Sequence, residues 1–231
     1  MPNLLLNLLP LQDQETILRD CELVDLQPRQ VLIEADERIQ YIYFPITCVV
    51  SQVVILSDGN GIECGIIGRD GFIGLSAYLG TEISPMRFIV QVPGEAWRLP
   101  VSQLRIHVIE LPRLQTLLAR YNDFLLASAS QSAACNQLHS VTQRCARWLL
   151  RVRGRIDSDS FPLTQELLAQ LLGVRRASVS IAAGALQDAR VITYAYGRIT
   201  ILNREGLEQM ACECVAAMRR RYESLFASLM G

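Results

Sequence analysis

Short apolar runs separated by turn residues fill the first half of the chain, at residues 31–33, 41–56, 62–67 and 87–99. In the last run Phe88, Val90 and Val92 alternate with Arg87 and Gln91, while Ile89 breaks the alternation. A period of two is typical of a half-buried antiparallel strand. Turn residues at 58–61 and at 93–94 separate the runs. Many short strands joined by hairpins predict a β-barrel or a β-sandwich.

After Pro112 the apolar period changes to alternating steps of three and four, which is typical of a long helix with one packed seam. The seam spans residues 114–138 and predicts a helix roughly 37 Å long, more than one small domain needs for itself. Its second half is rich in Ala and Ser, which let a partner helix approach closely. Packing of this helix against the barrel is the alternative. We predict that the seam is a dimer interface, formed by Leu117, Tyr121, Phe124, Ser128, Cys135 and Leu138.

The two parts of the chain differ in charge, although the net charge is only −1. Residues 1–140 carry nine arginines and fifteen acidic residues, whereas residues 141–231 carry thirteen arginines and eight acidic residues. Opposite charges indicate two different tasks. Every basic residue is Arg, which suits phosphate recognition, although genomic base composition is the simpler explanation.

Residues 141–153 predict an amphipathic helix with its arginines off the apolar face, and residues from 163 onward match a helix-turn-helix. Thr164 is placed to cap the first helix, and Gly173 permits the left-handed backbone of the tight turn. The apolar positions 168, 172, 179, 182 and 186 face inward. The N-terminal end of the second helix, the end that enters a major groove in this class of motif, then presents to solvent Arg175, Arg176, Ser178 and Ser180.

Two strands at 191–194 and 198–202, joined by residues 195–197, predict a wing behind the helix pair. Helix pairs with a glycine corner also occur in ordinary helical proteins, but the joint pattern favours DNA binding. Residues 204–230 predict one further amphipathic helix. Its Arg219, Arg220 and Arg221 either reach DNA or form a solvated cluster.

The seven cysteines and two histidines predict no metal site, since no Cys-x-x-Cys pair occurs. Buried, reduced thiols suit their apolar surroundings better and indicate a cytoplasmic protein. A thiol sensor at Cys212 and Cys214 is disfavoured, because residues two apart on a helix do not share a face. The Leu-rich residues 1–11 are too short for a membrane span and predict a docking helix. No nucleophile–base pair or phosphate loop can be recognised, so we expect neither an enzyme nor a cofactor.

Four segments carry a resemblance to a known family: residues 71–75 (Gly-Phe-Ile-Gly-Leu), 141–144 (Val-Thr-Gln-Arg), 163–167 (Leu-Thr-Gln-Glu-Leu) and 173–176 (Gly-Val-Arg-Arg). Through them nearly the whole chain resembles the Crp/Fnr superfamily of transcription regulators. The resemblance implies an α+β fold. A cyclic-nucleotide-binding-type β-roll sensor is expected at 1–110, a dimerisation helix at 111–139, and a winged helix-turn-helix with an extra C-terminal helix at 140–231. It also implies a homodimer that reads two DNA half-sites about one helical turn apart.

The same resemblance assigns a surface to DNA. Arg176 matches the arginine that pairs with guanine, whereas Arg144, Thr164 and Arg175 are expected at phosphates. A Glu and a second Arg often follow in the family, but Ala177 and Ile181 stand there, so the usual half-site is not expected. Double-stranded DNA, a second copy and RNA polymerase are the expected partners, and a membrane is not. The full expected surface is Arg144, Thr164, Gln165, Arg175, Arg176, Ser178 and Ser180.

Members of the family that bind cyclic AMP hold its ribose with a Glu and its phosphate with an Arg on the next strand. Here Phe72 stands at the Glu position and Met86 at the Arg position, with Arg87 one residue later. A shift by one residue turns a strand side chain to the opposite face. Either another, more apolar small molecule is the effector, or the pocket is vestigial. The pocket is expected around Phe72, Gly74, Leu75, Met86, Arg87, Ser128 and Ser130. The alternative function is a ligand-binding signalling module that does not touch DNA.

We therefore predict that cyclic AMP is not bound in the usual way, because Phe72 and Met86 stand at the positions of the Glu and the Arg that contact it in the family. Titration calorimetry of the purified protein with cyclic AMP should show no micromolar binding. Micromolar binding that is abolished by Arg87→Ala would contradict this prediction.

Overall fold

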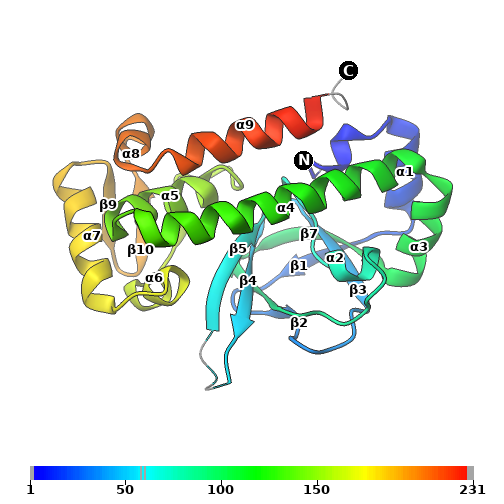
Figure 1. Ribbon diagram of the computed structural model, residues 1–231, viewed down its shortest axis with the longest axis horizontal. Helices are drawn as coiled ribbons and strands as arrows, with labels where there is room; N and C mark the ends of the chain where they lie inside the picture. The colour runs from blue at the N-terminus through cyan, green and yellow to red at the C-terminus, as the bar shows by residue number, and fades with distance from the viewer. Residues whose placement is uncertain (1–2, 58, 60, 228–231) are drawn as a thin grey trace.

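The computed structural model describes residues 3–57, 59 and 61–227 (Figure 1). Its N-terminal part is a β-roll of two antiparallel sheets, which confirms the barrel-like prediction. One sheet has the order β1-β7-β3, from β1 (Glu22–Leu26), β7 (Gly94–Pro100) and β3 (Tyr41–Pro45). The other has the order β2-β6-β4-β5, from β2 (Val31–Ile33), β6 (Arg87–Val92), β4 (Val49–Ile55) and β5 (Gly61–Ile67).

Side-chain alternation in the roll follows the sequence pattern. In β6, Phe88, Val90 and Val92 are buried, and Ile89 shares the half-buried face with Arg87. The sequence pattern did not reveal β1 or the break between β3 and β4. Asp58 and Asn60 of the predicted turn lie outside the described residues.

The N-terminal residues dock on the roll, as predicted, but residues 3–10 form only the short η1 (Leu6–Leu8), and the helix α1 (Leu11–Arg19) follows. Leu5 and Leu6 are buried in the core. The buried Asn3 amide donates to the carbonyls of Pro45 and Gly71, at 2.8 Å each. Because an unpaired amide is costly to bury, these bonds fix the position of the segment.

Two helices follow the roll, α3 (Val101–Glu110) and the 27-residue α4 (Pro112–Leu138). The predicted long helix is confirmed, but most of the predicted dimer face packs within the chain. Leu117, Tyr121, Phe124 and Cys135 are buried inside the chain, and Ser128 is half-buried. Leu138 is the exception, with 78% of its surface exposed. The period of three and four identified the packed face of the helix but not the partner that covers it.

The second unit begins with α5 (Val141–Arg153), which starts at a capping box between Ser140 and Gln143. Its predicted apolar face is buried in a second hydrophobic core. Arg147, predicted on the basic rim, is only 6% exposed, and its guanidinium donates to Ser132 Oγ of α4 at 2.7 Å. The arginine therefore ties α5 to α4.

A winged helix-turn-helix follows, as predicted, with α6 (Gln165–Leu172) and α7 (Arg176–Asp188). A three-stranded sheet of order β8-β10-β9 supports the helix pair. Its strands are β8 (Ser160–Pro162), β9 (Ile192–Ala195) and β10 (Arg198–Ile201). No element was predicted from the sequence for residues 160–162.

The C-terminal segment forms two helices where one was predicted, α8 (Arg204–Met210) and α9 (Cys214–Phe226). The backbone at Ala211 is extended, with φ −80° and ψ 165°, so the helix breaks there. The α9 helix lies along α4 (Figure 1), and Phe226 is buried in the core of the roll. The extra helix assigned to the DNA-binding unit therefore packs on the sensor unit. Residues 228–230 of the predicted helix lie outside the described residues.

Candidate nucleic-acid interface

Gly173 forms the corner between α6 and α7. Its backbone is left-handed, with φ 63° and ψ 42°, and the next N–H, of Val174, donates back to the Ala169 carbonyl at 3.0 Å. A residue with a Cβ in this conformation costs about 1–2 kcal/mol. At the other end of α6, Thr164 Oγ1 accepts from the Leu167 N–H at 3.1 Å, which confirms the predicted cap.

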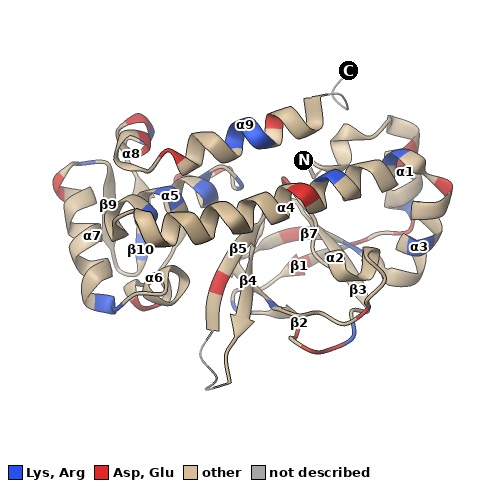
Figure 2. Ribbon diagram, viewed as in Figure 1, with Lys and Arg blue, Asp and Glu red and all other residues tan. Residues whose placement is uncertain are grey.

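Arg175 and Arg176 lie at the start of α7 with exposed side chains, as predicted. Figure 2 shows this basic end of α7 at the lower left, away from the roll. Among residues 3–57, 59 and 61–227, no acidic side chain forms an ion pair with either guanidinium. The N-terminal end of the helix dipole adds positive potential at the same place. The arrangement suits an anionic partner such as a nucleic-acid backbone.

The exposed face of α7 continues with Ala177, Ser180 and Ile181, and 74% of the Ile181 surface is exposed. Ser178 is half-buried, so it faces solvent less than predicted. The opposite face, including Val179, is buried in the second core. The helix therefore offers arginine, hydroxyl and apolar groups side by side.

Two further predicted contacts have partners within the chain. The Arg144 guanidinium donates to the Leu172 carbonyl at the end of α6. Burial lowers its pKa, as does the neighbouring Arg147. We therefore reassign Arg144 from phosphate binding to positioning α6. Thr164 is exposed, but its hydroxyl oxygen accepts the cap bond; Gln165 is half-buried at the first position of α6.

The hairpin of β9 and β10 presents two side chains that the sequence analysis did not single out. Tyr196 lies at its tip, with φ 51°, and its side chain is fully exposed. Arg198 is also exposed and donates from Nε to Ser160 Oγ at 3.2 Å. An aromatic residue directly before a glycine, Tyr196-Gly197, is the sequence signal that could have identified this tip.

Two family profiles match the chain in the order of its two units. The cyclic nucleotide-binding domain matches residues 23–106, and the Crp-like helix-turn-helix domain matches residues 143–210. The chain belongs to the Crp/Fnr superfamily of transcription regulators. It is a DNA-binding transcription regulator.

Solved structures share the fold of this Crp/Fnr regulator. FixK2 from Bradyrhizobium japonicum is 17% identical, with a TM-score of 0.70, and the match covers 83% of this chain and 98% of that chain. The c-di-GMP-responsive global regulator CLP from Xanthomonas campestris is 15% identical, with a TM-score of 0.67, covering 83% and 99%. A CRP-family regulator from Thermus thermophilus is 19% identical, with a TM-score of 0.67, covering 81% and 96%. No curated protein matches the chain significantly. Among the described helices of the regulator, none has the length and apolar character that crossing a bilayer requires.

Phe72 of the regulator lies in the core and does not line an open pocket. Its side chain is fully buried, with ring centroids 5.9 Å from Phe44 and 5.3 Å from Tyr121. The backbone beside it is equally close-packed, since a Cβ on Gly71 would lie 1.9 Å from the Tyr121 hydroxyl oxygen. The position at which the family holds a ribose is therefore part of the apolar core.

The other predicted effector residues are not gathered in one pocket. Arg87 donates from Nε to Glu34 Oε1 at 2.6 Å and lines a cavity of about 270 Å³ between the roll and α6. Ser128 lines a different cavity, of about 330 Å³, between α4, α5 and α9. Ser130 is exposed and donates to the Leu126 carbonyl at 2.9 Å. The remaining three members belong to the packed roll: Gly74 with φ 104° as the N-cap of α2 (Leu75–Tyr78), the half-buried Leu75, and the half-buried Met86.

Contacts between the roll and the winged unit form a site that the sequence analysis missed. Glu63 on β5 accepts from Trp148 Nε1 of α5 at 2.8 Å and from the Ser51 hydroxyl. Burial raises the pKa of the Glu63 carboxyl to about 7, against the opposing effect of the Ser51 hydrogen bond and of nearby arginines. A glutamate within an apolar strand is the signal that could have identified it.

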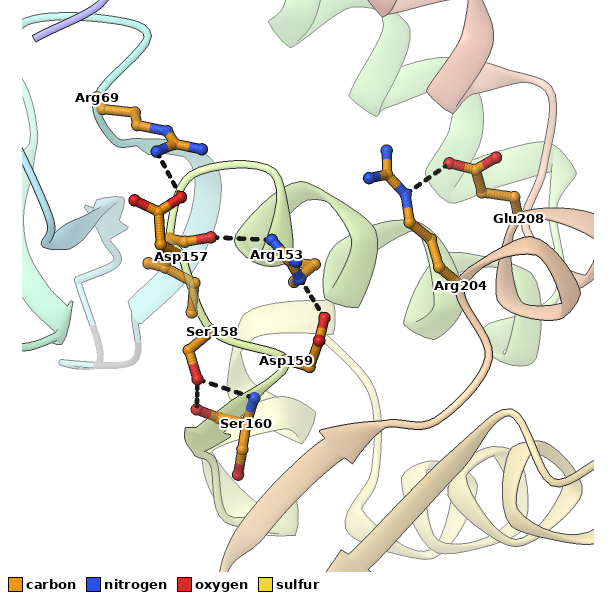
Figure 3. A network of polar contacts seen from close by, with 9 residues as sticks. Arg69, Arg153, Asp157, Ser158, Asp159, Ser160, Arg204 and Glu208 are labelled. Carbon is orange, nitrogen blue, oxygen red and sulfur yellow. Dashed lines mark hydrogen bonds and ion pairs between the residues drawn. The ribbon is translucent and has the colours of Figure 1, made fainter.

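Two ion pairs join the same two units. Arg155 contacts Asp70 at 2.7 Å, and Arg69 contacts Asp157 at 2.8 Å. Figure 3 shows the second pair beside Arg153, which holds the same loop through Asp159. Arg155 and Asp70 are mostly buried, so removing one partner leaves a charge without compensation.

One cluster of possible metal ligands lies at the end of α4. Cys135, His139, Cys212 and Cys214 place all their ligand atoms within 4.8 Å of one another. Spacing along the sequence had predicted no such group, because the four residues come from two segments far apart in the chain.

The raised pKa of Glu63 predicts that contact between the units weakens as pH rises. The protonated carboxyl is stable in this contact, so the stabilisation is complete below about 4.5, the ordinary pKa, and is lost as pH rises through about 7. Across this pH range we expect the free energy of unfolding of the wild type to fall by about 1–3 kcal/mol more than that of Glu63→Gln, because the glutamine side chain cannot ionise. Urea unfolding of both proteins at a series of pH values measures the difference. Parallel pH profiles for the two proteins would contradict the assignment.

Proposed function

We propose that the chain regulates transcription as a homodimer that places α7 of each copy in a major groove of double-stranded DNA. The observation that carries this proposal is the pair of exposed arginines at the N-terminal end of α7, directly after the Gly173 corner. Arg176 pairs with a guanine, and Arg175 binds phosphate. The protein acts in the cytoplasm, with RNA polymerase as a further partner, and it catalyses no reaction.

The rest of the α7 face supports a half-site different from that of regulators with Glu and Arg at the next two reading positions. Ala177 and Ile181 are exposed there. Neither can accept a hydrogen bond from cytosine or donate one to guanine, but both suit contact with a thymine methyl group. We therefore expect a preference for thymine at the two base pairs next to the guanine that Arg176 reads.

Dimerisation through α4 uses the face opposite the predicted one. A stripe with steps of three and four runs along this face, and its members are exposed or half-buried: Ala119, Asn122, Leu126, Ala129, Ala133 and Asn136. Leu126 is 67% exposed in the single chain. Small residues on both sides of a large apolar one suit the close approach of a second α4 around a two-fold axis.

The effector is a small molecule other than cyclic AMP. Burial of Phe72 and the pairing of Arg87 with Glu34 support this part of the proposal. The similar regulator from Xanthomonas is described as responsive to c-di-GMP, which shows that a protein with this fold can respond to a different molecule. The cavity between α4, α5 and α9 is the place we propose for the effector, because it contacts both units.

Binding of selected duplexes tests the DNA function. From a pool of random-sequence duplexes, the wild-type protein should enrich one symmetric site. Arg175→Ala with Arg176→Ala should weaken binding of that site by at least about 10-fold to 100-fold, since one bidentate arginine is worth about 1–3 kcal/mol. Arg113→Ala, which replaces an exposed arginine on α4, is the control and should bind as wild type. If no duplex is enriched, the alternative function applies, a ligand-binding signalling module that does not bind DNA.

A salt titration tests the phosphate contact. The plot of the logarithm of the binding constant against the logarithm of the salt concentration should have a slope shallower by about one for Arg175→Ala alone.

Sedimentation equilibrium tests the proposed dimer face. Leu126→Glu places a charge at the centre of the stripe, so we expect the dimer dissociation constant to rise by at least about 100-fold. Because Leu126 is exposed, the fold of each copy should not change. Leu138→Glu, also exposed but outside the stripe, should remain dimeric. If Leu138→Glu dissociates the dimer and Leu126→Glu does not, the dimer interface is the face of α4 that was predicted from the seam.

A further inference from the structure

Three cysteines and one histidine converge where α4 ends and α9 begins. Cys135 lies in the last turn of α4, and His139 is its C-cap. Cys212 lies in the break between α8 and α9, and Cys214 is the first residue of α9. The three cysteines are buried and His139 is half-buried. Because the helix breaks before α9, the expectation that residues 212 and 214 point apart does not hold.

The distances between the donor atoms suit one tetrahedral ion. Cys135 Sγ lies 3.5 Å from Cys212 Sγ, and Cys214 Sγ lies 3.7 Å from His139 Nδ1. With Zn–S bonds of about 2.3 Å and Zn–N bonds of about 2.0 Å, a tetrahedron places two sulfurs about 3.8 Å apart and sulfur and nitrogen about 3.5 Å apart. The observed separations differ from these by a few tenths of an ångström.

The groups around the cluster form the outer shell that a metal site needs. Both carboxylate oxygens of Glu213 lie near His139 Nε2, at 3.2 and 3.1 Å, which turns Nδ1 toward the sulfurs. A carboxylate behind a ligating histidine is the usual arrangement at zinc sites. Gln131 Nε2 donates to Cys214 Sγ at 3.1 Å.

A positive side chain offsets part of the negative charge at the cluster. Three thiolates and one divalent ion carry a net charge of −1, and the buried Arg147 supplies one positive charge. Arg147 acts on Cys135 through its charge and a hydrogen bond, so its positive charge lies beside the cluster. Thiolate is the form of cysteine that binds metal.

We propose that Cys135, His139, Cys212 and Cys214 bind one zinc ion. Soft thiolates with one imidazole select zinc over magnesium or calcium, and four protein ligands make a closed, structural site. All four residues lie outside the stretches matched by the two family profiles, 23–106 and 143–210. A disulfide between Cys135 and Cys212 is the competing chemistry. It uses two of the four donors and leaves the histidine with its carboxylate unexplained.

The ion ties together three parts of the regulator. It joins the end of α4 to the break before α9. Its ligand His139 directly precedes Ser140, where the winged unit begins. It therefore fixes the hinge between the two units and the position of α9 on α4. Removing zinc should speed amide hydrogen exchange in α9 while leaving the strands of the roll unchanged.

Metal analysis and cobalt substitution test the site. Full-length protein, purified anaerobically with a reductant, should contain one zinc per chain. After removal of zinc by a chelator, added Co²⁺ should give the ligand-field absorption of tetrahedral cobalt together with a thiolate-to-cobalt charge-transfer band. Cys212→Ser should lose that band, whereas Cys64→Ser, an exposed thiol on β5, should keep it.

Two milder variants keep the test decisive if Cys212→Ser does not fold, as judged by circular dichroism. Glu213→Gln should weaken cobalt binding by about 10-fold to 100-fold, the usual effect of an outer-shell change. His139→Cys should retain binding with a stronger charge-transfer band, because a fourth thiolate replaces the imidazole. Each of three results overturns the proposal: folded, reduced wild type without the charge-transfer band; metal-free protein with a Cys135–Cys212 disulfide; or iron with acid-labile sulfide.

Discussion

A row of aromatic rings through the middle of the molecule fixes the arrangement of its parts. It runs from Phe44 and Phe72 in the roll through Tyr121 and Phe124 on α4 to Tyr222 and Phe226 on α9. Successive ring centroids are 4.6–6.2 Å apart, within the range of tilted and edge-to-face pairs. Burying each large side chain contributes about 1.5–3 kcal/mol, so the row is a substantial part of the core.

Three features follow from this packing. Phe72 is fully buried in this row, so its ring belongs to the core of the roll. Most of the inner face of α4 is used within the chain, so its outer face is the one that we propose for a second copy. The row ends on α9, which runs antiparallel to α4 and so brings its first residue, Cys214, beside Cys135. Arg120 donates to the Leu225 carbonyl at 3.0 Å, and Arg221 contacts Asp123 at 2.9 Å, both along the same two helices.

The DNA-binding end of the molecule depends much less on this row. Its helix pair and wing pack in the second hydrophobic core, which also takes in Val49, Ile66 and Val92 of the roll. Arg144 and Arg147 extend from α5 and donate hydrogen bonds to Leu172 of α6 and Ser132 of α4, respectively. Arg175 and Arg176 remain on the surface because the Gly173 corner turns the start of α7 outward.

The sequence by itself determined the local elements and the function class. Thr164 as a cap, Gly173 in a left-handed turn and the buried positions of α7 are each set by interactions within a few residues, so pattern alone was sufficient. The same holds for the alternation in β6 and for the length of α4. These features explain why the helix-turn-helix and its exposed arginines were predicted correctly.

Only the tertiary structure decided what covers each face and which distant residues meet. A seam on α4 requires some apolar partner, but its period is the same whether the partner is the roll, α9 or a second copy. The helix break at Ala211 carries no glycine or proline to announce it, so Cys212 and Cys214 were assigned to one helix. Glu63 and Trp148, and Cys135 and Cys212, are separated by 85 and 77 residues, and their contacts depend on packing that no local pattern encodes.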